Sequence, residues 1–566
     1  LGNGLTLHST RLEQVVLEAA GPLRSVIRCT IPHIDQAGVA HLRSNLRLHI
    51  FANQPFIKLV HRLEVISPHL PPAVSGGPVA VDSPLSSAVA GMQDEESTLL
   101  RLSAFVLHIA WPGVQTLQHG DEAPALHSDG WRVCQTDDLG YQRWVEGRSE
   151  VHAGRLSGPV RAQGANGVVD VGVRNFWQLY PKGLAAHPHG IDVELLPVLP
   201  AAPMSGGADA AHRLYFWLRD GSYLLKAGMA LTNEILLGFD LAAQEAARIY
   251  QWLQTPLLAR PAIDYANNTR ALNPIAPKAG SRLPQYEELA DQALHSFHDD
   301  RAAVRAYGQL NFGDWYGEST WSWGNNEYDP AFCGYLEFLR GGDPRWAAWA
   351  AESARHQADV DTVNFSSDET QIGAQAMHIP GHLGGYLPPY FRSKMKGTKN
   401  LPSHTWVEGA ALHYLLTGDE TVRESLDRTR RWLTQNSWFD SYEFTNCREA
   451  GWHLIHLCML ATALQDPRAL LGAALIVERV LERQEPGGGW EHNLTESHCG
   501  CGYPRCRGEA GFMVGVLLSG LQRYYFSTGD PRVAQAIVGG ARWLIRRTYD
   551  PTTGYFRYTS CTARTL

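Results

Sequence analysis

Hydrophobic and polar residues alternate with a period of two through the first part of the chain, as far as about Tyr250. In 24–31, for example, Ile27, Cys29 and Ile31 are separated by polar side chains. This period is typical of antiparallel strands with one face in water. So many strands predict a large antiparallel β-sandwich over residues 1–250. Similar stretches occur at 46–50, 57–66, 100–109, 168–173, 191–199 and 214–218, between loops rich in Gly, Pro and Ser.

The period changes after residue 250. A segment rich in Pro, Asn and Ala at 251–284 is interpreted as a linker that lies along the surface. Beyond it, apolar residues recur at helical spacing, most clearly in the stripe from Val533 to Ile545. We therefore predict a helical domain over 285–566.

An internal repeat organises this helical part. Each copy joins an apolar helix end to a new helix through an Asp, with Gly before the Asp in three of the four copies and Pro after it in three. Such Gly residues favour a left-handed helix end, and the Asp is suited to N-cap the next helix. Short turns of one type separated by irregular spacings predict an α/α toroid, a complete or incomplete (α/α) barrel, with long loops on the opposite face. The four Asp are Asp343, Asp419, Asp466 and Asp530.

Length and charge limit the number of domains and the kinds of partner that this protein can have. A chain of 566 residues is too long for one ordinary core and indicates two domains or three. The formal net charge of -8 argues against nucleic acid as a partner. We expect no membrane partner either, because no apolar run approaches the roughly 18 residues that span a bilayer. A soluble protein follows, and secreted, periplasmic and cytoplasmic locations all remain open.

The stretch 311–329, NFGDWYGESTWSWGNNEYD, mixes aromatic side chains with carboxylates and amides. Aromatic rings cover the apolar faces of sugars, while carboxylates and amides bind their hydroxyl groups. An aromatic core segment with polar ends is the alternative interpretation. Further histidines and tyrosines cluster in the loops 377–390, 403–409, 442–456 and 487–506.

Two reactions fit these residue types. Lysis of a uronate polysaccharide requires a group that neutralises the carboxylate, a base for the C5 proton and an acid for the oxygen at C4. Asn, Arg or a metal can neutralise, and His or Tyr can transfer the protons. Glycoside hydrolysis requires two opposed carboxylates instead. The candidates for that role are Asp314, Glu318, Glu327, Asp329 and Glu408.

The segment 492–506, HNLTESHCGCGYPRC, is a weak candidate for a metal site. Its residues His498, Cys499, Cys501 and Cys506 have suitable types, but the spacing lacks the two separated knuckles of a strong zinc motif. A disulfide and buried thiols are alternatives. We expect no cofactor, with a divalent metal left open.

Several segments together resemble the exo-acting rhamnogalacturonan lyase family: RNFWQLYPKGL at 174–184, GMALTNEILLGFD at 228–240, NFGDWYGE with WGNNEYD, GHLGGY, and HTWVEGAALHYLLTGD. The resemblance implies a central β-sandwich, a C-terminal α/α toroid, and β-elimination at a uronic acid from a chain end. The partner would be an acidic polysaccharide or oligosaccharide, as in pectin. We expect the N-terminal barrel of that family to be missing or reduced here, which leaves specificity open.

GNNEYD and HIPGHLGGY are also similar to toroid segments of hyaluronate and chondroitin lyases, and that similarity implies roles for single residues. Asn325 or Asn326 would neutralise the carboxylate. His382 would be the base, with His378 and His404 as rivals, and Tyr386 or Tyr328 the acid. Trp315, Trp323 and Trp406 would stack on sugars, and Glu408, Arg448, Arg174 and Trp177 would add substrate contacts. A glycoside hydrolase and a non-catalytic carbohydrate-binding protein are the alternatives.

Overall fold

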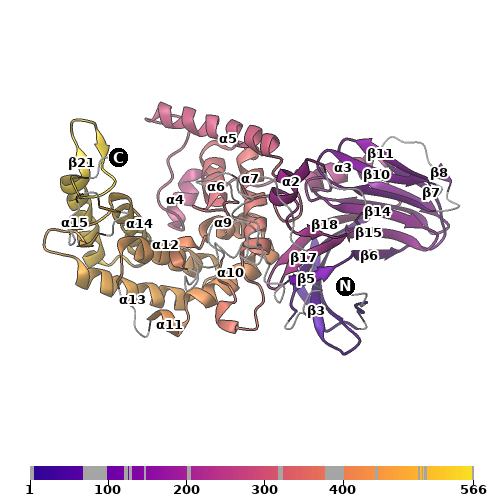
Figure 1. Ribbon diagram of the computed structural model, residues 1–566, viewed down its shortest axis with the longest axis horizontal. Coiled ribbons are helices and arrows are strands. Elements are labelled where there is room, and N and C mark those ends of the chain that lie inside the picture. Colours follow the sequence, from indigo (N-terminus) through magenta and orange to yellow (C-terminus); the bar gives the residue numbers. More distant parts are fainter. Residues whose placement is uncertain are drawn as a thin grey trace.

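The computed structural model consists of two bodies side by side, one made of sheets and the other of helices (Figure 1). The N-terminus lies near the junction of the two bodies, and the C-terminus lies at the end of the helical body that is farthest from the sheets. The structure describes residues 6–9, 11–67, 99–119, 125–126, 130–145, 148–199, 205–316, 323–375, 401–439, 444–494, 498–499, 501 and 506–563.

Within the described residues, two large antiparallel sheets face each other and confirm the predicted β-sandwich. Side chains from both inner faces, among them Val133, Val171 and Ile235, form one apolar core. The nine-stranded sheet runs β1 (Gln14–Ala20), β2 (Arg24–Ile34), β3 (Ala40–Phe51), β4 (Phe56–Val65), β18 (Ala230–Phe239), β13 (Gly167–Val173), β12 (Val160–Gly164), β7 (Val114–His119), β8 (Ala125–Leu126). The six-stranded sheet runs β11 (Arg148–Ala153), β10 (Gly140–Val145), β9 (Trp131–Gln135), β14 (Lys182–His187), β15 (Gly190–Leu196), β6 (Phe105–Ala110).

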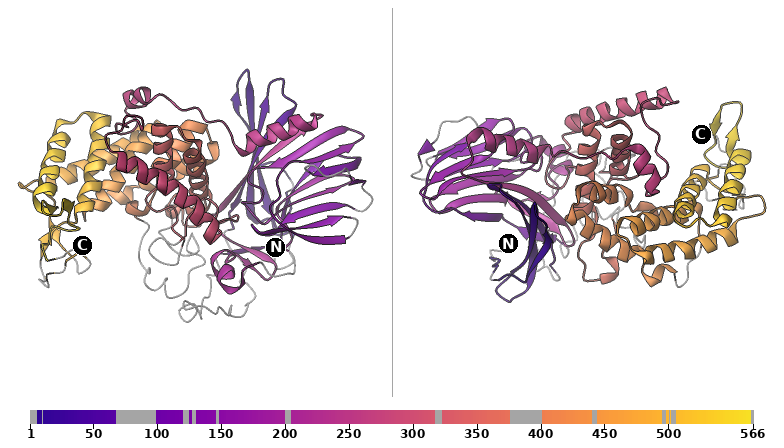
Figure 2. Two further views of the ribbon diagram at one scale, coloured as in Figure 1. Left: turned by 90° about the horizontal axis from the view of Figure 1, so that it is seen from above. Right: turned by 180° about the vertical axis from the view of Figure 1, so that it is seen from behind.

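A third, small sheet and two helices complete the β domain. The sheet runs β16 (Leu218–Arg219), β17 (Ser222–Lys226), β5 (Leu99–Leu102), and helix α2 (Gly207–Arg213) precedes it. Helix α3 (Ala243–Gln254) packs on the nine-stranded sheet, where the Tyr250 hydroxyl donates to the carbonyl of Val173. The chain then passes through α4 (Ile263–Thr269) to the helical domain (Figure 2). There Lys278 donates its backbone N–H to the carbonyl of Arg340.

The helical domain is built from hairpins whose first helices pack against one another. These inner helices, α6, α9, α12 and α14, supply most of one large apolar core, and the second helix of each hairpin covers them on the outside. The hairpins are α6 (Pro330–Gly341) with α7 (Pro344–His356), α9 (Glu408–Thr417) with α10 (Glu420–Leu433), α12 (Cys447–Ala463) with α13 (Pro467–Arg483), and α14 (Gly511–Thr528) with α15 (Pro531–Thr548). Around them lie α5 (Pro284–Val304), α11 (Asn436–Phe439), the short helices η2 (Gln357–Asp361), η3 (Glu369–Gln371) and η4 (Pro402–His404), and the strand pairs β19 (His492–Asn493) with β20 (Arg507–Gly508) and β21 (Tyr549–Asp550) with β22 (Tyr555–Phe556).

The four repeated turns are confirmed as helix caps. Asp343, Asp419, Asp466 and Asp530 each accept a hydrogen bond from the backbone N–H two residues on. The glycine before three of them ends the preceding helix in the left-handed conformation. The repeat therefore marks the short connections within each hairpin, and the longer connections between hairpins carry the candidate site. Within the part of the chain that the structure describes, no helix combines the length and the apolar character needed to cross a bilayer.

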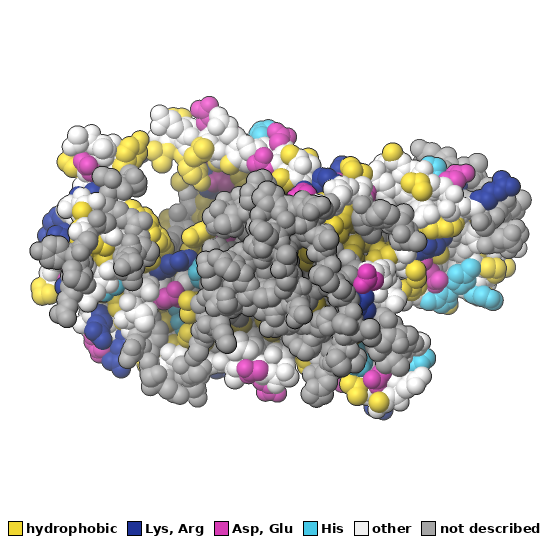
Figure 3. Space-filling view, viewed as in Figure 1, with side chains coloured by type: hydrophobic (Ala, Val, Ile, Leu, Met, Phe, Trp, Pro, Cys, Tyr) yellow, Lys and Arg dark blue, Asp and Glu magenta, His cyan; other side chains and the backbone are white. Residues whose placement is uncertain are grey.

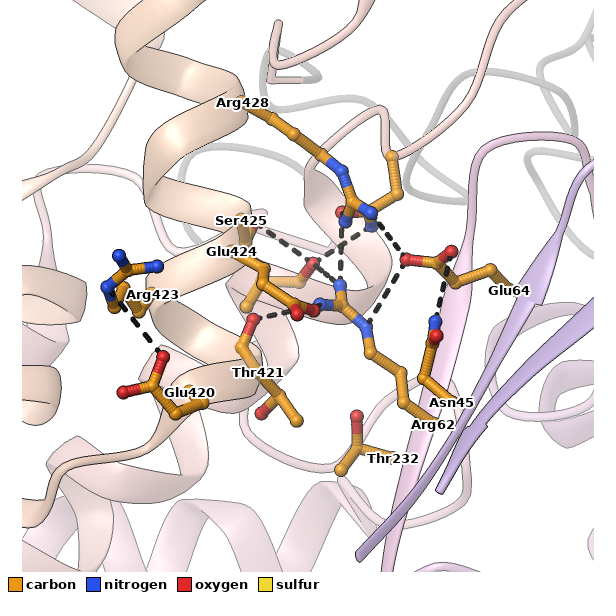
Figure 4. Close-up of polar contacts among 12 residues, drawn as sticks. Asn45, Arg62, Glu64, Thr232, Glu420, Thr421, Arg423, Glu424, Ser425 and Arg428 are labelled. Atoms are coloured by element: carbon orange, nitrogen blue, oxygen red, sulfur yellow. Dashed lines mark hydrogen bonds and ion pairs between the residues drawn. The ribbon is translucent and has the colours of Figure 1, made fainter. Parts of the chain in front are cut away.

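A buried polar network joins the two domains (Figure 4). Arg62 of β4 is fully buried and donates to the carbonyl of Thr421 at 2.8 Å and to that of Ala358 at 3.0 Å, both in the helical domain. Arg428 of α10 donates back to Glu64 of β4 at 2.7 Å. Each charge removed from water thus has a partner on the other domain, which fixes how the domains dock.

Candidate functional site

The connection from 323 to 329, which leads into α6, has a strained backbone. Four of its residues, Asn325, Asn326, Tyr328 and Asp329, have φ between 50 and 63°. Asn and Asp tolerate this left-handed region, but a tyrosine rarely adopts it. Strain of this kind costs about 1–3 kcal/mol per residue and persists only where the surroundings impose it.

Two buried carboxylates impose the conformation. Asp314 accepts the backbone N–H groups of Asn325 and Asn326, each at 3.0 Å. Asp329 accepts those of Phe332, as the N-cap of α6, and Gly409, at the start of α9. The turn is therefore fixed at both ends, and it holds Glu327 in the interior while Tyr328 stays 53% exposed.

Glu327 meets His404 of η4 across 77 residues of sequence. Its Oε1 accepts a hydrogen bond from His404 Nδ1 at 2.8 Å, and both side chains are buried. On the other side of the ring, an Arg448 Nη atom lies 3.4 Å from Nε2. Because a guanidinium only donates and a carboxylate only accepts, this arrangement assigns the proton of the neutral ring to Nδ1 and a lone pair to Nε2. A carboxylate that orients the imidazole in this way is typical of a general base.

Aromatic rings border this polar group. The ring of Tyr328 lies 5.5 Å from that of Trp406, and Trp406 meets Trp452 edge to face at 4.9 Å. Trp406 is buried, whereas Trp452 is half-buried. The structure thus brings together four predicted positions, Tyr328, His404, Trp406 and Arg448, with Glu327 and Trp452 beside them.

The side-chain amide of Asn326 takes part in holding the turn. The Asn326 amide donates towards the Ser353 carbonyl at 3.3 Å and Asp361 at 3.4 Å, and its side chain is buried. Next to it, His356 lies 3.4 Å from Asp361. Burial lowers the pKa of His356, but the charges of Asp361 and Asp314 outweigh this and raise it above its ordinary value. Asn325 is buried in the same place.

Two predicted stacking residues pack against the protein itself, Trp323 in the interior and Trp315 half-buried. Trp323 is 2% exposed, belongs to a core cluster and donates from Nε1 to the carbonyl of Arg213. Trp315 lies over the backbone of Gly324. A Cβ at position 324 would come within 2.6 Å of the Trp315 Nε1 atom. Both rings therefore pack against the protein around the 323–329 turn. Of the three tryptophans predicted to stack on sugars, Trp406 is the one that lies beside Tyr328.

The carboxylates considered for hydrolysis are largely engaged. Asp314 and Asp329 hold the turn, and Glu408 of α9 forms an ion pair with Arg523 of α14 at 2.5 Å. Burial raises the pKa of Glu408 to about 7 and that of Asp329 to about 6. Glu408 is therefore engaged with α14 in the interior of the helical domain. Glu318 lies outside the described residues.

Arg174 and Trp177, predicted to reach the site from the β domain, lie at the junction of the domains. Arg174 forms an ion pair with Glu234 at 2.7 Å. Trp177 packs its ring 4.8 Å from that of Tyr307, with the Arg155 guanidinium 3.9 Å above it. Both are used in docking the domains. His378, His382 and Tyr386 lie outside the described residues.

Two possible metal-ligand groups occur among the described residues. Cys499, Cys501 and Cys506 are joined by Cys561, while the ring of His498 stacks on Tyr558 instead. The second group, His108, His187 and Asp192, lies on the six-stranded sheet, and Figure 3 shows histidines gathered at the surface of the β domain.

Trp452 and Cys561 are not among the positions predicted from the sequence, and Glu327 is predicted there only as a carboxylate for hydrolysis. Trp452 follows Arg448 by four positions on α12, so a helix over this segment places both on one face. That spacing is the signal that identifies Trp452. Nothing in the sequence links Glu327 to His404 or Cys561 to Cys499, because the partners lie in separate irregular segments.

No family model matches the sequence, and no curated protein does. Among solved structures, the chain is similar to a bacterial glucoamylase in complex with acarbose, at 8% identity and a TM-score of 0.22 over 95% of this chain and 59% of the other. It is also similar to a polysaccharide lyase, at 8% identity and a TM-score of 0.25 over 98% of this chain and 87% of the other. The chain thus spans 59% of the length of the glucoamylase. Similarity this low does not bear on the activity.

Proposed function

We propose that this protein is a polysaccharide lyase that cleaves a uronate-containing, rhamnogalacturonan-like polysaccharide by β-elimination. The observation that carries the proposal is His404 held between Glu327 and Arg448 beside the exposed Tyr328. These groups supply a base, a cation for the carboxylate and an acid, the three elements that this elimination needs. The resemblance of the sequence to exo-acting rhamnogalacturonan lyases supports the same chemistry and adds action from a chain end.

Arg448 acts first by binding the uronate carboxylate in a charge-assisted pair, which stabilises the charge that develops at C5. Its movement towards the substrate frees Nε2 of His404, which takes the C5 proton. The C–H electron pair forms the C4–C5 double bond, and the C4–O bond breaks with its electrons on oxygen. Tyr328 donates its hydroxyl proton to that oxygen. Trp452 forms the apolar side of the site, and the buried Trp406 packs against it.

Elimination is favoured over hydrolysis because the described candidate carboxylates are already occupied by hydrogen bonds or ion pairs within the protein. Asp314, Asp329 and Glu408 each accept buried backbone donors or pair with a buried arginine. Glu327 is the remaining described candidate, and it is bound to His404. Retaining and inverting hydrolysis both require a second carboxylate across the scissile bond.

The test is an assay of the full chain on rhamnogalacturonan and other uronate polymers, following the ultraviolet absorption of unsaturated uronate. We expect that signal, with short products from the outset if cleavage starts at chain ends. His404→Ala should lower kcat by about 10²–10⁴-fold. The control is His295→Ala, which removes an exposed histidine of α5. New reducing ends without the absorption would indicate hydrolysis, and binding without either product would indicate a carbohydrate-binding protein.

A further inference from the structure

Four cysteines from two distant parts of the chain converge near the beginning of α14. Cys499, Cys501 and Cys506 belong to the connection between β19 and β20, and Cys561 follows β22. Their four Sγ atoms all lie within 4.8 Å of one another. Cys499 Sγ is 3.0 Å from that of Cys501 and 3.6 Å from that of Cys561. These separations are well beyond the bond length of a disulfide, about 2.05 Å.

The spacing of the sulfurs suits a tetrahedral metal ion. Zinc binds thiolates at about 2.3 Å, which places the sulfurs of a tetrahedron about 3.8 Å apart. The backbone N–H of Cys501 also points to Cys499 Sγ, 3.5 Å away. Donors of this kind orient thiolate ligands in metal sites. His498, the ligand that the sequence suggested, is replaced by Cys561, which makes the set four thiols.

The surrounding structure holds the two parts of the cluster in place. Leu494 donates its backbone N–H to the Cys506 carbonyl at 2.8 Å, which closes the loop that carries three of the cysteines. Glu509 and Ser560 exchange hydrogen bonds at 3.0 and 3.1 Å, which brings the segment with Cys561 alongside. The paired strands here are only two residues long, so they have little apolar core of their own.

We propose that Cys499, Cys501, Cys506 and Cys561 bind a structural zinc ion that fastens the segment after β22 to the β19–β20 loop. A closed set of four protein thiolates leaves no position for substrate, so the ion is structural. Small irregular segments without a sufficient core are commonly stabilised by such a site. The site is separate from His404 and does not depend on the proposed lyase activity.

The first experiment uses elemental mass spectrometry to measure the metal content of the full chain, purified without chelators. We expect about one zinc ion per chain. Cys561→Ser should reduce the zinc content to near zero. Cys29→Ser, which changes a cysteine of β2 in the other domain, should retain it.

A second measurement applies if Cys561→Ser folds poorly. The wild-type chain is loaded with cobalt(II), and a tetrahedral four-thiolate site gives strong sulfur-to-cobalt absorption. Cys506→His keeps a ligand, so it should retain the metal with weaker sulfur bands, which separates loss of a ligand from loss of the fold. Iron in place of zinc, a chain without metal, or a disulfide found among the four cysteines by mass spectrometry would overturn the proposal.

Discussion

At the scale of single residues, the candidate site depends on Glu327, a carboxylate whose residue type also suits glycoside hydrolysis. Glu327 is buried and bonded to His404. In the proposed elimination it orients the ring and stabilises the positive charge that the ring gains when it takes a proton, without contacting the sugar. The left-handed turn explains how one residue faces inward while its neighbour Tyr328 faces outward.

Glu327→Gln tests this positioning role. The amide retains an acceptor for Nδ1–H but lacks the charge, so we expect kcat to fall by about 10–100-fold with KM nearly unchanged. Glu478→Gln, at an exposed ion pair on α13, is the matched control. A fall in thermal stability with unchanged kcat would show a structural role alone.

Lys182 of β14 provides a prediction for stability. It is 1% exposed and donates to Gln309 of the helical domain at 2.7 Å, and burial lowers its pKa to about 7. The unfolded chain therefore binds more protons than the folded one between pH 7 and the ordinary lysine value, and stability due to this group rises with pH across that window. Between pH 7 and 9, wild type should gain up to ~3 kcal/mol over Lys182→Met in urea unfolding. If the difference in unfolding free energy between wild type and Lys182→Met is equal at pH 7 and pH 9, the lowered pKa of Lys182 is contradicted.

At the scale of elements, the four capping aspartates look alike in sequence but differ in surroundings. Asp530 caps α15 at the surface, with Arg532 beside it. Asp419 caps α10 and also pairs with Arg355 at 3.1 Å and His413 at 3.2 Å at the domain junction. Burial would raise the pKa of Asp419, but Arg355 and His413 hold it well below its ordinary range.

Replacing Asp530 or Asp419 by alanine separates the contribution of the helix cap from that of the ion pairs at the domain junction. Asp530→Ala removes one capping bond and should lower the free energy of unfolding by about 1 kcal/mol. Asp419→Ala also leaves Arg355 with one partner fewer in the interior, so we expect a loss of about 3 kcal/mol or more. Both are measured by urea unfolding at neutral pH. Equal losses would mean that the junction contributes nothing beyond the cap.

At the scale of the whole molecule, one carboxylate of β18 connects the two domains. Glu234 is fully buried and pairs with Lys58 and Arg174 of the β domain and with Arg355 of α7. Burial alone would raise its pKa, but Arg355, Lys58 and Arg174 hold it well below its ordinary range. Its stabilising effect is therefore present above the pKa of an unfolded glutamate and is lost as the pH falls through the lower folded value.

Glu234→Gln should lower the free energy of unfolding by about 3–5 kcal/mol at neutral pH, because three cations lose their shared partner. The difference from wild type should shrink as the pH falls below about 4. In the Glu234→Gln variant, calorimetry should also detect separate unfolding transitions for the two domains. Glu245→Gln, at an exposed ion pair of α3, is the control. A single transition at an unchanged temperature would contradict the linking role.

The sequence by itself determined the order of the two domains and most of their elements, but it missed helices α2, α3 and α4. Period two, then helical spacing, identified the sandwich and the helices, and the Gly-Asp-Pro turns located the hairpins, because caps and periodicity depend on residues a few positions apart. Similarity to lyase segments also pointed to Asn326, Tyr328, His404, Trp406 and Arg448. Tertiary structure alone decided which of the predicted positions lie together.

Glu327 lies 77 residues from His404, and Cys499 lies 62 from Cys561. Each pair meets only once the hairpins have packed and the connections between them are fixed. Trp315, Trp323 and Trp406 are equivalent as residue types, and only their contacts show that Trp315 packs on Gly324, Trp323 on the core and Trp406 on the ring of Tyr328. A sequence records local conformational preference, whereas contact between distant irregular segments depends on the packing of the whole chain.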